Sequence, residues 1–237
     1  MNALCDLILI RHEETEGNAA LHKSGFGGDS SGFTSVLRSR SSDTWRLSEN
    51  GRRRCIILRD WIKNNVSMDN GLVRVVSPLI RAQETANLIL PGTTWMTDEL
   101  VRNRVWGGIE CVPWNEWPAF CNVNRHDELP SGFHQAYPQG EAMSKVWQRT
   151  KEFIDSLERS ALVVTHGEVV EMSIMHIENV HEKDYRPPEL KRDGSHIRNG
   201  HVVWYSKRNP WTEEILQRFS FKKMWFDGTD QGWSSIV

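Results

Sequence analysis

The chain has 237 residues, 38% hydrophobic and 25% charged, with 29 basic residues against 31 acidic ones. This composition is typical of a globular protein that buries a full core, and the balanced charge argues against a general nucleic-acid or membrane binder. The four cysteines form no C-x-x-C pair, and no apolar run approaches the roughly 20 residues of a membrane helix. We expect a single domain over residues 1–237, without disulfides, in the reduced cytoplasm.

Three short apolar segments are predicted to be buried strands that deliver polar residues at their carboxyl ends. Residues 7–10 lead into Arg11 and His12, residues 73–76 lead into Ser77, and residues 161–165 lead into His166. Apolar runs of this length are typical of strands in a parallel sheet that is covered on both faces. The polar residues that follow them are therefore expected to meet at one edge of the sheet.

Helical segments lie between these strands. Ser48 is expected to cap a helix that runs to about Asn64 and turns Cys55, Leu58 and Ile62 toward the core. Residues 141–157 show the same apolar period. Strands that alternate with helices predict an α/β fold, here a three-layer sandwich with a mainly parallel central sheet and helices on both faces.

Three segments fall outside this alternation. Residues 23–43 are rich in Gly and Ser and are expected to form a mobile loop. Residues 104–139 lack periodicity and predict an inserted lid over the strand ends. Residues 202–205 and 215–221, with a turn at Asn209-Pro210, predict a closing hairpin. The aromatic residues of the predicted lid are equally compatible with a substrate wall and with a small satellite core; they are Trp106, Trp114, Trp117, Phe120 and Tyr137.

Three sequence blocks stand at the predicted strand ends. Residues 11–18 read R-H-E-E-T-E-G-N, residues 77–86 read S-P-L-I-R-A-Q-E-T-A, and residues 164–167 read V-T-H-G. In order, they resemble the R-H-G-E-T-x-x-N, S-P-L-x-R-A-x-x-T-A and H-G blocks of the histidine phosphatase superfamily, in its phosphoglycerate-mutase-like branch. Only Glu13 departs from the first block. The resemblance implies a phosphoglycerate-mutase-like fold and a phosphohistidine intermediate on His12.

The residue types at these positions suit phosphoryl transfer. Arg11 and Arg81 can each donate two hydrogen bonds to phosphoryl oxygens, and His166, if protonated, adds a third positive donor. His12 must attack as a neutral imidazole, so one ring nitrogen should donate to a backbone carbonyl while the other faces phosphorus. The resemblance also implies that the substrate-binding pocket includes Thr15, Asn18, Asn103 and Gly167. By residue type alone, Thr15 and Asn18 could equally be helix-start residues.

Asn103 departs from the family pattern in a way that affects the chemistry. Residues 101–107 read V-R-N-R-V-W-G and resemble a family block L-R-E-R-x-W-G, whose Glu donates a proton to the leaving group. An amide cannot give up that proton. Either another acid serves, or the leaving group hardly needs one, or the chain was altered to bind without fast turnover. Glu110 and Glu99 are the nearest candidate glutamates in the sequence.

The leading interpretation is a phosphatase that acts on a small phosphorylated substrate, a phosphomonoester or a phosphoanhydride, and that binds neither nucleic acid nor a membrane. A phosphoglycerate mutase shares the nucleophile and is the close alternative. A non-catalytic phospholigand-binding module is favoured by Asn103 and disfavoured by the intact arginines and histidines. No H-E-x-x-H motif or zinc-ligand spacing occurs, so we expect neither a metal nor another cofactor.

Overall fold

The computed structural model describes residues 4–26, 28–68, 71–116, 133–185 and 196–236. Its centre is a seven-stranded sheet with the strand order β3-β2-β4-β1-β5-β6-β7. The strands are β1 (Asp6–Arg11), β2 (Val73–Val76), β3 (Met96–Thr97), β4 (Ala161–Thr165), β5 (Val202–Ser206), β6 (Phe221–Phe226) and β7 (Thr229–Ser235). The first four are mutually parallel, and β5, β6 and β7 continue the sheet antiparallel. Since β6 points the same way as β1, the sheet is mainly parallel, as predicted.

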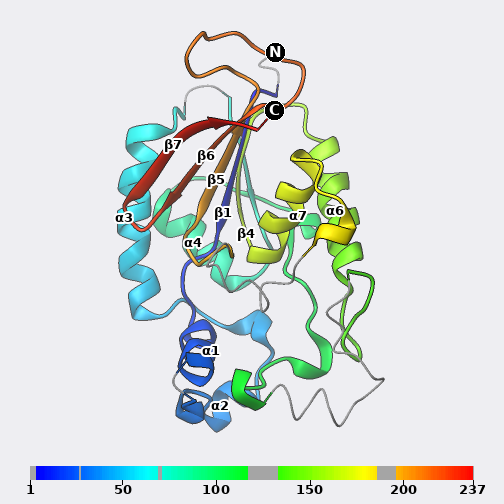
Figure 1. Ribbon diagram of the computed structural model, residues 1–237. Helices are drawn as coiled ribbons and strands as arrows, with labels where there is room; N and C mark the ends of the chain where they lie inside the picture. The colour runs from blue at the N-terminus through cyan, green and yellow to red at the C-terminus, as the bar shows by residue number, and fades with distance from the viewer. Residues whose placement is uncertain (1–3, 27, 69–70, 117–132, 186–195, 237) are drawn as a thin grey trace.

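Helices cover both faces of this sheet (Figure 1). They are α1 (Glu16–Phe26), α2 (Ser35–Arg38), α3 (Glu49–Asn65), α4 (Ile80–Ile89), α6 (Met143–Asp155) and α7 (Gly167–Ile177). Alternate residues of β1 divide between the two faces, because side chains of a strand point in turn to opposite sides. Leu7 and Leu9 pack with residues of α6 and α7, whereas Ile8 and Ile10 pack with residues of α3 and α4. The predicted three-layer α/β sandwich is confirmed.

Both predicted helices are present within a few residues of their expected bounds. The Ser48 side chain caps α3 by accepting a hydrogen bond from the Gly51 amide at 2.9 Å. Cys55, Leu58 and Ile62 are buried on the inner face of that helix. α6 begins at Met143 and ends at Asp155, so it is shorter than the predicted segment at both ends. None of the described helices is long and apolar enough to cross a membrane.

Residues 23–43, predicted to be a mobile loop, contain short helices. The segment completes α1, then forms the 3₁₀ turn Ser30–Gly32, helix α2, and the 3₁₀ turn Ser42–Thr44. Phe33, Leu37 and Trp45 form a small core with Ala20 of α1. Gly17 permits this packing, because a Cβ at that position would lie 2.0 Å from the Trp45 ring. These apolar residues, spaced among the Gly and Ser, order the segment beyond the carboxyl ends of the strands (Figure 1).

The predicted closing hairpin is wrong in its second strand. Its first strand is β5, but the partner strand β6 begins only at Phe221, where the predicted second strand ended. Arg208 and Ile215 form just an isolated bridge. β7 adds an edge strand that the sequence did not predict; it is polar and largely exposed. Residues of this kind lack the alternating apolar pattern that marks a half-buried strand.

Candidate active site

His12 lies directly beyond β1, and its side chain is only 4% exposed. The amide of His12 donates to the Thr165 carbonyl at 2.8 Å, which extends the pairing of β1 with β4 and fixes the backbone. Nδ1 of the ring lies 2.8 Å from the carbonyl oxygen of Glu13. Because a carbonyl only accepts, Nδ1 carries the ring proton. Nε2 is therefore the nitrogen with the free lone pair, as a nucleophile requires.

Two guanidinium groups flank this ring. Nε of Arg81, in the first turn of α4, donates to Nε2 of His12 at 3.2 Å, and its Nη1 donates to the Ser42 carbonyl at 2.7 Å. Arg11 donates from Nη1 to the Ile197 carbonyl, and its Nε is buried without a partner among the described residues. The structure therefore brings Arg11, His12 and Arg81 together as the motif predicts, with donor capacity left for a ligand.

His166 stands beside His12, with ring centroids 5.1 Å apart. Its Nε2 lies 2.7 Å from the Ser77 hydroxyl, and its Nδ1 is buried without a partner among the described residues. The Ser77 amide donates to the Val164 carbonyl at 3.0 Å, so the ends of β2 and β4 hold this pair in register. The polar residues at the predicted strand ends thus meet at one edge of the sheet.

Both histidines are held in the neutral form. Burial lowers the pKa of His12 well below 6.5, and the charges of Arg81 and Arg11 lower it further. Burial, Arg81 and then His12 and Arg11 lower the pKa of His166 in the same way. The two guanidinium groups therefore carry the positive charge of the free site. The third positive donor, expected if His166 were protonated, is not present in this state.

Thr15 and Asn18 are joined to each other at the start of α1. The Thr15 hydroxyl donates to Oδ1 of Asn18 at 3.0 Å and accepts from the Asn18 amide at 3.0 Å. Nδ2 of Asn199 donates to the same Oδ1 and to the His12 carbonyl, each at 3.1 Å. Asn18 also lines the pocket described below, whereas the fully buried Thr15 does not. Thr15 thus supports the pocket from behind.

Glu13, the departure from the first block, points away from the pocket. Its side chain is 1% exposed and accepts from Nε of Arg54 at 3.1 Å. Burial raises the pKa of Glu13, and the charge of Arg54 opposes this effect. The carboxylate fits because Gly200 has no Cβ; a Cβ there would lie 2.0 Å from Oε1 of Glu13. The φ of +78° at Gly200 also favours glycine. Arg54 also donates to the Asn199 carbonyl at 3.1 Å, which ties α3 to the turn behind His12.

A pocket of about 140 Å³ opens beside His12. The predicted site residues Arg11, Asn18, Arg81, Asn103 and Gly167 all line it together with His12. His166 does not line the pocket and reaches it only through its contact with His12. Four other lining residues, Leu21, Ser42, Trp45 and Glu168, were not predicted as site residues. Glu168 carries a sequence signal that could have identified it, because it follows the H-G block directly.

The described part of residues 104–139 closes one side of this pocket. Five of its residues line the cavity: Trp106, Ile109, Glu110, Cys111 and Val112. Tyr137 lies behind Trp106 at 6.2 Å between ring centroids, and the Arg104 guanidinium lies 5.0 Å from the Trp106 ring. Trp106 is thus part of the pocket wall and Tyr137 supports it. The Trp114 side chain, Trp117 and Phe120 lie outside the described residues.

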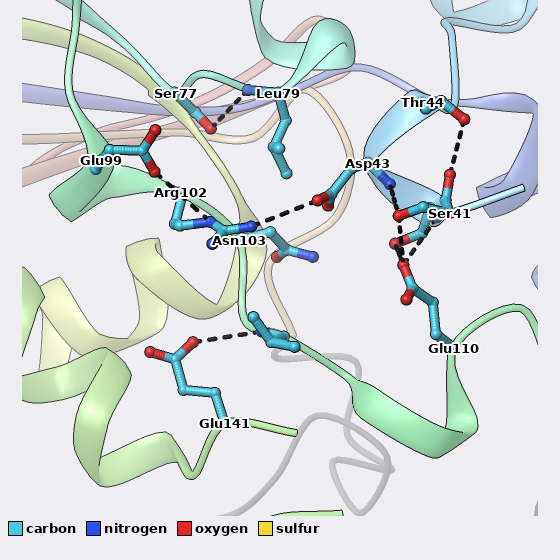
Figure 2. Close-up of polar contacts among 12 residues, drawn as sticks. Ser41, Asp43, Thr44, Ser77, Leu79, Glu99, Arg102, Asn103, Glu110 and Glu141 are labelled. Carbon is cyan, nitrogen blue, oxygen red and sulfur yellow. Dashed lines mark hydrogen bonds and ion pairs between the residues drawn. The ribbon is translucent and has the colours of Figure 1, made fainter. Parts of the chain in front are cut away.

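Asn103 lines the pocket. Figure 2 shows its amide together with the two candidate acids, Glu99 and Glu110. Oε1 of Glu110 accepts from the Ser42 amide at 2.8 Å, from the Ser42 hydroxyl, and from the Ser41 hydroxyl at 3.3 Å. Glu99 does not line the pocket; its side chain is 74% exposed and lies 3.8 Å from Nε of Arg102. Of these two candidate glutamates, only Glu110 therefore faces the site.

Among the described residues, no group of three or more His, Cys, Asp or Glu side chains is arranged to hold a metal ion. The chemical groups around the pocket are instead two guanidinium groups, a neutral imidazole whose Nε2 is unprotonated, and an apolar wall. Such a set binds an oxyanion and presents a nucleophile to it.

Several solved structures share this fold. The chain superposes on a mycobacterial glucosyl-3-phosphoglycerate phosphatase with a TM-score of 0.64 at 18% identity, over 90% of this chain and 99% of the other. It superposes on mycobacterial hydrolase 1 with a TM-score of 0.64 at 17% identity (95% and 99%), and on YhfR of Bacillus stearothermophilus with 0.61 at 21% (89% and 94%). These likenesses show a shared fold.

No curated protein sequence matches the chain significantly. The family model for the histidine phosphatase superfamily, branch 1, matches residues 7–198, which include all three blocks at the strand ends. The chain therefore belongs to the histidine phosphatase superfamily.

Proposed function

We propose that the protein is a phosphatase that hydrolyses a phosphomonoester or a phosphoanhydride through a phosphohistidine on His12. One observation carries this proposal: the Glu13 carbonyl fixes the proton of His12 on Nδ1, and Nε2 meets the Arg81 guanidinium beside the pocket. The nucleophile is thus buried, neutral and already directed at the place where a phosphoryl group would be held.

The guanidinium groups of Arg11 and Arg81 bind the phosphoryl oxygens and stabilise the charge that spreads over them in the transition state. Nε2 of His12 attacks phosphorus, the bond to the leaving group breaks, and water then hydrolyses the phosphoramidate. The pair of His166 and Ser77 supports His12 from the sheet side.

We further propose that residues 104–139 select the leaving group. Five residues of this segment line the pocket, and Trp106, Ile109 and Val112 among them supply apolar surface. The glucosyl-3-phosphoglycerate phosphatase named above shares only the fold at 18% identity. Its substrate is therefore one member of the test panel, together with other sugar phosphates, nucleotides and phosphopeptides.

The test is direct detection of the intermediate. Protein mixed with an aryl phosphate and quenched without acid should gain the mass of one phosphoryl group on the peptide that contains His12, and acid should remove it. His12→Ala should abolish both the label and phosphate release. Active protein that carries no label in a single turnover, or a label on Ser77, contradicts the mechanism. Conversion of 3-phosphoglycerate into 2-phosphoglycerate would indicate a mutase.

A phospholigand-binding module without turnover is the second candidate, and the presence of Asn103 in the pocket is the observation that favours it. Binding of inorganic phosphate by wild-type protein without any phosphate release from an aryl phosphate would support the binding module. Release that depends on His12 excludes it.

A further inference from the structure

We propose that Glu168 donates the proton to the leaving group, in place of the acid that Asn103 lacks. This proposal rests on the phosphohistidine mechanism and adds a catalytic residue to it. Glu168 is the second residue of α7 and lines the pocket with His12 and Asn103. It is half-buried, so it can contact a bound substrate and still exchange protons with solvent.

The position of Glu168 places it next to the phosphoryl site. The preceding residue, Gly167, lies against Arg11, since a Cβ there would be 3.2 Å from Nη1 of that side chain. Burial lowers the pKa of Arg11, and Glu168 is the strongest of three carboxylates that oppose this effect. Burial also lowers the pKa of Arg81 to about 10, opposed first by Asp43 and then by Glu168. A carboxylate that acts on both guanidinium groups is close to the oxygens they would bind.

The other acid of the pocket is already engaged. One oxygen of Glu110 accepts hydrogen bonds from the Ser42 amide, the Ser42 hydroxyl and the Ser41 hydroxyl. These donors hold the Glu110 carboxylate against the turn at residues 42–44. By contrast, Glu168 makes no hydrogen bond or ion pair to any of the described side chains. Its carboxyl group is therefore free to turn toward a leaving group.

The proposed steps balance as follows. Nε2 of His12 forms a bond to phosphorus, and the bond from phosphorus to the leaving oxygen breaks. That oxygen keeps the electron pair and takes the proton of Glu168, so an alcohol and a carboxylate result. In the second step, the Glu168 carboxylate takes a proton from water as the water oxygen attacks phosphorus. The phosphorus–nitrogen bond breaks, neutral His12 returns, and Glu168 is protonated again.

The experiment compares Glu168→Gln with wild type on an alkyl phosphate and on p-nitrophenyl phosphate. General-acid catalysis contributes roughly 10²- to 10⁴-fold and matters most for basic leaving groups. Glu168→Gln should therefore lower kcat for the alkyl ester by about 10²-fold or more, and lower phosphoenzyme formation from the aryl ester by less than about threefold. The phosphohistidine should accumulate in the variant, because attack by water loses its base.

Control variants distinguish this proposal from the phosphohistidine mechanism on which it rests. Glu99→Gln changes an exposed acid outside the pocket and should leave both rates unchanged, and Glu168→Asp should restore part of the alkyl rate. Glu110→Gln should change the rates for the alkyl and the aryl ester by the same factor. If Glu168→Gln slows phosphoenzyme formation from both esters by one factor, or from neither, while wild type still labels on His12, Glu168 is not the donor. If wild type does not label on His12, the phosphohistidine mechanism itself fails.

Discussion

Nε of Arg81 donates a hydrogen bond at 3.2 Å to Nε2 of His12, the nitrogen that is proposed to attack phosphorus. The lone pair of Nε2 cannot accept from Arg81 and attack phosphorus at the same time. A bound phosphoryl group therefore has to displace the guanidinium from Nε2 before the reaction. Its oxygens are the natural replacement, because two parallel bonds from a guanidinium match their geometry. In the proposed mechanism, Arg81 therefore orients the nucleophile in the free site and would clamp the substrate in the complex.

We expect Arg81→Lys to lower kcat/KM for p-nitrophenyl phosphate by about 10²- to 10³-fold, because a point charge cannot reproduce the two-donor fork. Steady-state kinetics on the purified variant measures this effect. Arg52→Lys is the matched control: Arg52 pairs with Glu84 at the surface, and its side chain is 46% exposed. A loss at Arg52 equal to that at Arg81 would show that the effect is not specific to the clamp.

The pH profile should report the neutral state of His12. Burial, with the charges of Arg81 and Arg11, lowers the pKa of His12 well below 6.5. As pH falls, the nucleophile therefore stays unprotonated through its ordinary titration range. We expect the acidic limb of kcat/KM to lie below pH 6.5, the ordinary value for histidine. Arg81→Gln removes one charge that lowers this pKa and should move the limb toward higher pH.

The measurement is kcat/KM for an aryl phosphate across the pH range, together with NMR titration of the His12 ring proton. Because the substrate also titrates, the NMR titration of the ring is needed to assign the acidic limb of kcat/KM to His12. An acidic limb at or above the ordinary histidine value, matched by the ring signal, would contradict the neutral state inferred from burial.

The buried pair of Glu13 and Arg54 should matter for stability more than for chemistry. Arg54→Met leaves the Glu13 carboxylate, 1% exposed, without its cation. We expect a loss of about 3 kcal/mol, at the lower end for buried pairs because the Arg54 side chain is 22% exposed. Urea unfolding measures it. The double variant Glu13→Gly, Arg54→Met restores the residue of the family block and should recover most of the loss. A double variant no more stable than Arg54→Met alone would contradict the pairing.

Asn103→Glu should add an acid to the pocket. We expect turnover of alkyl phosphates to rise, with little effect on p-nitrophenyl phosphate, because only basic leaving groups need the proton. If Glu168 is the present donor, Asn103→Glu should also rescue Glu168→Gln on alkyl esters by about 10-fold or more. Rates for wild type, the two single variants and the double variant form a double-mutant cycle. If Asn103→Glu binds substrate as well as wild type does but changes no rate, position 103 is too far from the leaving oxygen.

The local sequence was sufficient for most of the fold and for the centre of the site. Apolar runs of strand length, the Ser48 cap and the period of α3 are short-range signals, and the structure follows them. Arg11 and His12 end one such run and His166 another. Because parallel strands end at a common edge, their convergence could be predicted without knowing the strand order.

Tertiary structure decided what depends on side chains far apart in the chain. The core of Phe33, Leu37 and Trp45 orders a segment that composition alone marked as a loop. Arg54 meets Glu13 only because α3 lies against the turn at Gly200. The choice between acids likewise needed the fold: Glu99 is nearer to Asn103 in the sequence than Glu110 is, yet Glu99 is exposed and Glu110 faces the pocket. Pairings across such distances are set by packing, which no local pattern encodes.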